Sequence, residues 1–115
     1  MQKIPWNTVK EEKLSELICR QTIHGRNITL ALFQLAKGAL VPVHSHENEQ
    51  MCFILEGMIK FFMGSEEIVA GKNEVVHIPP GQEHGAEVLE NFVGMDIFSP
   101  PRSDWMRGED SYLRK

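Results

Sequence analysis

The chain has 115 residues, the size of one domain, and its 42% hydrophobic and 24% charged residues are ordinary for a globular protein. A formal net charge of −4 without a block of Lys or Arg argues against a nucleic-acid partner. No apolar run reaches the ~18 residues of a membrane span, and two cysteines make no disulfide framework. We therefore expect a cytoplasmic protein with one domain over residues 1–115 and neither a membrane nor a nucleic-acid partner.

The first half of the chain carries helix and strand signals of unequal strength. Residues 10–18 place three apolar side chains on one helical face, but the stretch is short, so we expect a helix or an irregular lead-in. Residues 27–35 are rich in Ile, Thr, Leu and Phe and stop before a Lys-Gly pair, which predicts a strand. Residues 51–55 and 58–63 are two further strands, and Glu56-Gly57 between them predicts a hairpin turn.

Short strands separated by Gly, Pro and Asn turns continue through the second half. We predict turns at residues 64–65, 71–73, 79–81 and 90–91. The strands between them cover residues 68–70, 75–78, 86–89 and 92–98. One helical turn, capped by Ser103 or Asp104, is expected at residues 103–107. Seven or eight short strands with such turns predict an all-β sandwich or barrel rather than βαβ units.

A His-x-His pair, His44 and His46, supplies the first candidate metal ligands. Alternate side chains of a strand point to one face, so the two imidazoles lie on the same side, about 7 Å apart along the chain. A strand that returns after the following polar turn brings Gln50 near the same ion, with Glu49 as the alternative oxygen ligand. Such a pair alone is often two surface histidines, so the assignment depends on a third imidazole.

His84 is the natural third imidazole. It begins a strand just after the Pro79-Pro80-Gly81 turn, which restricts the backbone ahead of it. Three neutral imidazoles and one oxygen ligand suit a transition-metal ion such as Zn, Ni, Fe, Mn, Co or Cu rather than Mg or Ca. We predict one such divalent ion, held by His44, His46, Gln50 and His84.

These residues lie in two motifs that resemble those of the cupin superfamily. The matching positions are Gly38, His44, His46, Gly57, Gly71, Pro79, Gly81 and His84. The resemblance implies a single-domain cupin, an antiparallel double-stranded β-helix or jelly-roll barrel. Its core would cover residues 27–98, with a lead-in at 1–26 and a tail at 99–115. Gln50 stands where most cupins carry Glu, which leaves a bound ion more positive and a stronger Lewis acid toward an anion.

Asp96, Phe98 and Arg102 are candidate pocket residues. Asp96 and Phe98 share parity in the last long strand, and Arg102 follows on a Pro-Pro segment. If their face is the barrel interior, Asp96 is a buried carboxyl group near a cation, and Arg102 can grip a substrate carboxylate with two hydrogen bonds. The alternative is that Asp96 faces solvent and Arg102 pairs with Asp104. From the residues themselves, both alternatives stay open.

The Gln ligand, the Asp-x-Phe-x-x-x-Arg ending and the Trp105…Tyr112 tail are similar to the pectin-degradation cupins. That family linearises the cyclic 4,5-unsaturated uronates released by pectin and alginate lyases, giving the open-chain keto-uronate. The resemblance implies a metal-dependent enzyme acting on a small sugar acid, with Asp96, Phe98 and Arg102 needed for activity. Two other functions stay open: a non-catalytic cupin that binds a sugar acid or other small anion, and an iron-dependent dioxygenase.

Met51, Phe53 and Leu55 have the opposite parity to Gln50, so they project outward if Gln50 points inward. An apolar outer face on such a sheet is usually buried by a second copy of the chain. We therefore expect an isologous homodimer.

Overall fold

Eight strands form one antiparallel sheet in the computed structural model, which describes residues 1–114. They are β1 (Glu12–Ser15), β2 (Ile18–His24), β3 (Thr29–Leu35), β4 (Leu40–His44), β5 (Glu49–Met63), β6 (Glu66–Gly71), β7 (Val75–Ile78) and β8 (His84–Ser99). Three short helical segments accompany them: η1 (Trp6–Thr8), α1 (Ser103–Met106) and η2 (Ser111–Leu113). The predicted all-β jelly-roll fold is confirmed.

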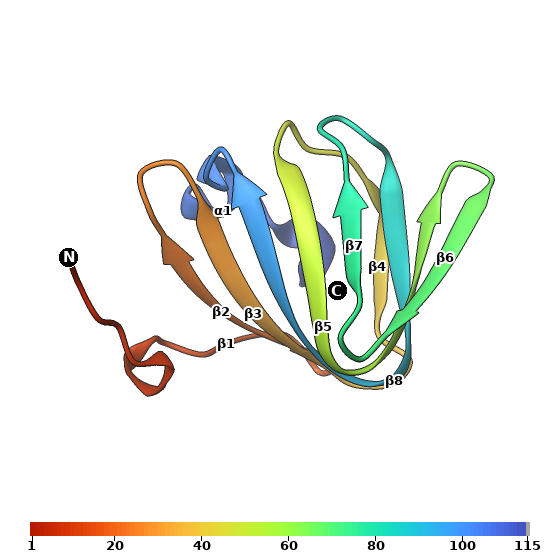
Figure 1. Ribbon diagram of the computed structural model, residues 1–115, viewed down its shortest axis with the longest axis horizontal. Coiled ribbons are helices and arrows are strands. Elements are labelled where there is room, and N and C mark those ends of the chain that lie inside the picture. Colours follow the sequence, from red (N-terminus) through yellow and green to blue (C-terminus); the bar gives the residue numbers. More distant parts are fainter. Residues whose placement is uncertain (115) are drawn as a thin grey trace.

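The two longest strands, β5 and β8, join the two halves of the sheet. The strand order is β1-β2-β3-β8-β5-β6, with β4 paired to β8 and β7 paired to β5. In Figure 1, β1, β2 and β3 lie to the left of β5, and β7, β4 and β6 lie to its right, so the sheet curls around an interior. Alternate residues of each strand point into that interior, where Phe33, Phe61, Phe92 and Phe98 are buried.

The hairpin predicted at Glu56-Gly57 is wrong, because β5 continues through both residues without reversing. Gly57 has φ +86° and lies among shifts in the β5–β8 register, so the strand bends there instead of reversing. A Cβ on Gly57 would lie 2.1 Å from the carbonyl oxygen of Asn91 on β8, so only glycine allows this approach. The turn predicted at residues 90–91 is likewise the middle of β8. These residues bend two long strands where the sequence suggested that they separate four short ones.

The sheet begins inside the segment expected to be a lead-in. β1 and β2 form an antiparallel pair within residues 12–24, so the helix considered for residues 10–18 is absent. Leu14 and Ile18 are both buried in the core. Their spacing of four residues suits one face of a helix, but here each faces inward from a different strand.

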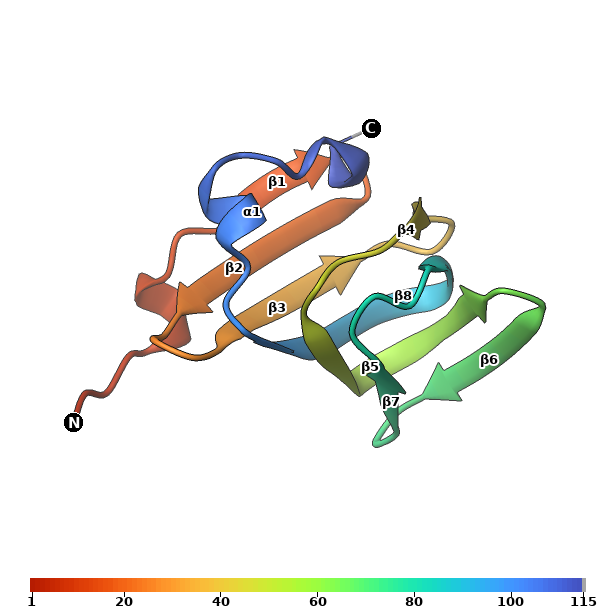
Figure 2. The ribbon, with the colours of Figure 1, turned by 90° about the horizontal axis from the view of Figure 1, so that it is seen from above.

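The C-terminal tail folds back over the open side of the sheet. The helical turn expected at residues 103–107 is present as α1, although Arg102 and not Ser103 or Asp104 is its N-cap. Figure 2 shows α1 lying over β2 and the end of the chain lying close to β1. Asp110 of the tail forms a salt bridge with Arg20 of β2, in which Oδ2 of Asp110 lies 2.8 Å from Nη2 of Arg20. Of the tail expected at residues 99–115, only Lys115 lies outside the described residues.

The outer face of β5 carries exposed apolar side chains, as its parity predicted. Met51 is 46% exposed and Phe53 is 37% exposed, whereas Leu55 is half-buried. Strand pairing places Val75 beside Phe53 and Ile97 beside Met51, which extends this outer apolar face onto β7 and β8. Among residues 1–114, no helix is long and apolar enough to cross a membrane.

Candidate metal centre

Three imidazole rings meet at one end of the interior. His44 ends β4, His84 begins β8 and pairs with it across the sheet, and His46 lies in the loop after β4. One nitrogen of each ring lies within 4.8 Å of the others. The structure thus brings together the three histidines selected from the sequence, although only two of them belong to strands.

Each of these imidazoles directs Nδ1 at a backbone carbonyl. The acceptors lie two residues away, at 2.8 to 3.1 Å, and belong to Pro42, Asn48 and Gln82. Because a carbonyl oxygen only accepts, Nδ1 carries the proton, and Nε2 of each neutral ring keeps its lone pair. A backbone acceptor on the far nitrogen is the usual support of a metal-ligating histidine.

Burial keeps the three rings neutral. It lowers the pKa of His44 to about 4, against the opposing effect of the hydrogen bond to Pro42. Burial also lowers the pKa of His46 to about 4, and the nearby charge of Arg102 adds to it. Burial lowers the pKa of His84 as well. Neutral imidazole is the form that binds a metal ion, so the site needs no deprotonation near pH 7.

Gln50, and not Glu49, faces the histidines. Its Oε1 lies 3.1 Å from Nε2 of His46. With Nδ1 of His46 protonated, these are two lone-pair atoms facing each other, an arrangement that a shared cation stabilises. Glu49 points to the other face of β5, where its carboxylate lies 2.7 Å from Nε2 of His77. Three imidazole nitrogens and one amide oxygen are donors that fit a divalent transition-metal ion.

Asp96 lies inside the barrel, paired across the sheet with Cys52 on β5. Its Oδ1 is buried and has no hydrogen-bond partner within residues 1–114. Burial raises the pKa of Asp96 to about 6, opposed by the Cys52 thiol, the Gln50 amide and the charge of Arg102. A buried carboxyl oxygen without a partner is costly, so its position is typical of a group that meets a ligand.

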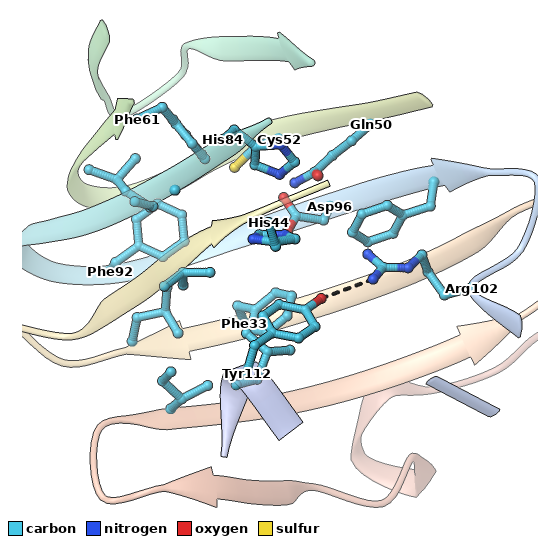
Figure 3. A pocket seen from close by; sticks show the side chains of 18 of the residues that line it. Phe33, His44, Gln50, Cys52, Phe61, His84, Phe92, Asp96, Arg102 and Tyr112 are labelled. Carbon is cyan, nitrogen blue, oxygen red and sulfur yellow. Dashed lines mark hydrogen bonds between the residues drawn. The ribbon is translucent and has the colours of Figure 1, made fainter. Parts of the chain in front are cut away.

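Arg102 is buried and already holds two partners. Its Nε and Nη2 donate to Asp104 at 3.0 and 2.9 Å, and Nη2 also donates to the Tyr112 hydroxyl at 2.9 Å (Figure 3). The guanidinium lies over the rings of Phe98 and Trp105, 4.7 and 4.1 Å from their centroids. The pair with Asp104 is one of the two alternatives left open above. Among the contacts of residues 1–114, Nη1 is the one guanidinium nitrogen left without a partner, so the guanidinium alone cannot make the expected two-pronged contact in this arrangement.

One pocket contains most of these side chains, with its polar groups at one end (Figure 3). The polar lining consists of His44, Gln50, His84, Asp96, Arg102 and Tyr112. The other end is lined by apolar side chains, including Phe61 and Phe92. A ligand with one strongly polar or anionic end is therefore oriented with that end toward the histidines.

Sequence reasoning did not select Tyr112 or Asn48 as site residues. The Tyr112 ring lies against His44, with ring centroids 4.4 Å apart and an angle of 30° between the planes. The Asn48 amide donates to the carbonyls of Pro100 and Pro101, which ties the His46 loop to the segment that carries Arg102. The resemblance of the Trp105…Tyr112 tail pointed to this segment, but no local pattern shows that the tail folds into the pocket.

Comparisons with known proteins match this architecture. An uncharacterised protein of Streptomyces coelicolor, SCO3923, is 26% identical over 84 residues, covering 72% of this chain and 80% of that protein. The solved structure of KdgF from Halomonas sp. has a TM-score of 0.79 at 22% identity, over 86% of this chain and 94% of the other. An RmlC-like cupin from Shewanella frigidimarina has a TM-score of 0.80 at 24% identity, over 86% and 90%.

At such identities the structural similarity shows the fold and no more. The family is shown by a different comparison, which matches residues 31–95 to the cupin domain family. This match includes the three histidines and Gln50. The match spans more than half of the chain, so the chain belongs to the cupin domain family.

Proposed function

We propose that this cupin is a metal-dependent enzyme that converts cyclic 4,5-unsaturated uronates to the linear keto-uronate. The observation that carries the proposal is the juxtaposition of three neutral imidazoles with the partnerless carboxyl oxygen of Asp96 and with Arg102. Ring opening of a uronate requires an anchor for its carboxylate, stabilisation of oxygen charge and a proton relay. The sequence resemblance to pectin-degradation cupins supports this substrate class.

His44, His46, His84 and Gln50 would hold the metal ion. When bound, a divalent transition-metal ion supplies a Lewis acid for oxygen atoms that gain negative charge. The remaining steps are assigned to side chains of the pocket.

Asp96 is the proposed proton relay. Its carboxylate accepts the proton of the C1 hydroxyl while the bond from C1 to the ring oxygen breaks, and the electron pair of that bond passes to the ring oxygen on C5. The carboxylic acid then returns the proton to C4, and C5 becomes a ketone. The reaction is an isomerisation, so no atom is gained or lost. A pKa of about 6 suits a group that both accepts and donates a proton near neutral pH.

Arg102 and Phe98 would orient the substrate. Phe98 packs under the guanidinium and also lies against His46, with ring centroids 5.7 Å apart. This packing restrains Arg102, so its free Nη1 has a defined position for an anionic group.

Loading the protein with Zn, Ni, Fe, Mn or Co and supplying unsaturated galacturonate tests this function. The ultraviolet absorbance of the C4=C5 double bond is expected to disappear faster than it does without protein, with the keto-uronate detected by NMR. Loss of the signal at the spontaneous rate, with metal fully bound, would contradict the proposal. Tight binding without turnover would then favour the non-catalytic cupin, and oxygen consumption would favour the dioxygenase.

We also infer that two copies of the chain meet through the outer apolar face of β5. Phe53→Glu places a charge on that face, so light scattering at micromolar concentration is expected to change from a dimer mass toward a monomer mass. Leu40→Glu, at a 64% exposed position on β4, is the matched control and should leave the mass unchanged. A monomer in the parent protein would contradict the inference.

A further inference from the structure

The hydroxyl group of Tyr112 has a proton that no group in the described residues accepts. Its oxygen receives hydrogen bonds from Arg102 Nη2 at 2.9 Å and from Trp105 Nε1 at 3.2 Å. Guanidinium and indole N–H groups can only donate, so the phenol oxygen is the acceptor in both bonds. Within residues 1–114 the hydroxyl makes no other hydrogen bond, so its own O–H is free to donate.

A second unused donor lies beside it. Nε and Nη2 of Arg102 are engaged by Asp104 and Tyr112, whereas Nη1 makes no hydrogen bond in the described part of the chain. Tyr112 and Arg102 both line the pocket, and Figure 3 shows the tyrosine oxygen facing the guanidinium at its polar end. Two free donors, one of them cationic, are thus neighbours in the pocket.

The chemistry of these donors selects an anion. A hydroxyl whose oxygen accepts a hydrogen bond from a cation becomes a stronger donor, because the two bonds polarise each other. Hydrogen bonds to a carboxylate are among the strongest that such donors make. A neutral sugar hydroxyl would form much weaker hydrogen bonds with the same two donors.

We propose that Tyr112 O–H and Arg102 Nη1 together bind the two oxygens of the substrate carboxylate, a role that rests on the proposed function. This mixed pair replaces the two-pronged contact that Arg102 cannot make alone. Trp105 is then a positioning residue, since its indole N–H helps to orient the phenol oxygen. Tyr112 becomes a specificity-determining residue for sugar acids over neutral sugars.

Tyr112→Phe in the metal-loaded full chain tests the site. Affinity for D-galacturonate, measured by calorimetry, is expected to fall about 10- to 100-fold, as for the loss of a hydrogen bond to a charged group. Binding of D-galactose, which lacks the carboxylate, should not change. With unsaturated galacturonate as substrate, KM should rise while kcat changes little, because the contact holds substrate and transition state alike.

Arg107→Gln is the matched control. Arg107 is an exposed cation of the same tail that pairs with Glu109 and does not line the pocket, so galacturonate affinity should stay within about threefold of the parent. Metal content and thermal midpoint are measured for both variants. The methyl ester of galacturonate provides a test on the parent protein itself, since it should bind as weakly as galactose.

Three results would overturn the carboxylate site. They are unchanged galacturonate affinity in Tyr112→Phe, equal losses in Tyr112→Phe and Arg107→Gln, and equal binding of the acid and its methyl ester by the parent. The site and the reaction can fail separately. If the acid binds as expected but unsaturated galacturonate is not turned over, the site stands and the proposed function fails. If unsaturated galacturonate is turned over and Tyr112→Phe leaves its KM unchanged, the proposed function stands and the carboxylate site fails.

Discussion

Replacing His44 and His46 together by alanine is expected to reduce the metal content from about one ion per chain to almost none. The change removes two of the three Nε2 lone pairs, and the remaining imidazole and amide cannot hold a transition-metal ion at micromolar concentration. Elemental analysis of the purified variant measures the result. The matched control is His77→Ala, because His77 is exposed and pairs with Glu49 on the other face of β5. Full occupancy in the double variant would contradict the ligand assignment.

The pH dependence of metal content provides a second measurement on the same site. Burial lowers the pKa of His44 and His46 to about 4, below the value of 6.5 expected in an unfolded chain. The rings therefore stay neutral through pH 6, and protons compete with the metal only as the pH approaches 4. In the metal-free protein, the unfolded state binds more protons between these pKa values, so stability falls as the pH drops from about 6.5 to 4. Metal content that persists well below pH 4 would contradict histidine ligation.

Asp96→Asn is expected to lower kcat on unsaturated galacturonate by at least about 100-fold with little change in KM. The amide keeps the shape of the side chain and leaves the four proposed metal ligands intact, but it cannot accept or return the proton. Steady-state kinetics on the fully metal-loaded variant gives both constants. Activity close to that of the parent would remove Asp96 from the reaction.

A stability measurement shows whether that loss reflects chemistry or misfolding. In the metal-free parent, burial raises the pKa of Asp96 from 3.8 to about 6, so the folded state binds more protons than the unfolded state between these values. The stability of the parent that comes from this group is therefore present below pH 4 and lost as the pH rises through 6. Asn does not titrate, so the free energy of unfolding should shift in favour of the variant by up to about 3 kcal/mol between pH 4 and pH 7. If the variant is unfolded at pH 7, the lost activity results from misfolding and not from the missing proton relay.

Long-range pairing accounts for the errors in the predicted elements. The residues around Gly57 and Asn91 have the composition of turns, and a turn is the commonest use of such residues. Here they oppose each other on β5 and β8, where a bend with a close backbone approach satisfies the same preferences. Local sequence does not distinguish a bulge from a turn, because the difference lies in the partner strand.

The sequence by itself determined the fold class and the three histidines of the candidate metal site. Period-two alternation and frequent turn residues specify a curled antiparallel sheet, and the spacing of His44, His46 and His84 around the predicted strands was enough to select them. Both signals are local: each depends on residues a few positions apart, whose relative directions follow from strand geometry.

Only the tertiary structure decided between the alternatives that the sequence left open. Which of Glu49 and Gln50 faces the histidines depends on which face of β5 is covered, and whether Asp96 is buried depends on the strands beside β8. The placement of Tyr112 against His44 requires the tail to fold back and bind Arg20 through Asp110, 90 residues away along the chain. Contacts of this kind join segments far apart in sequence, so no window of neighbouring residues contains them.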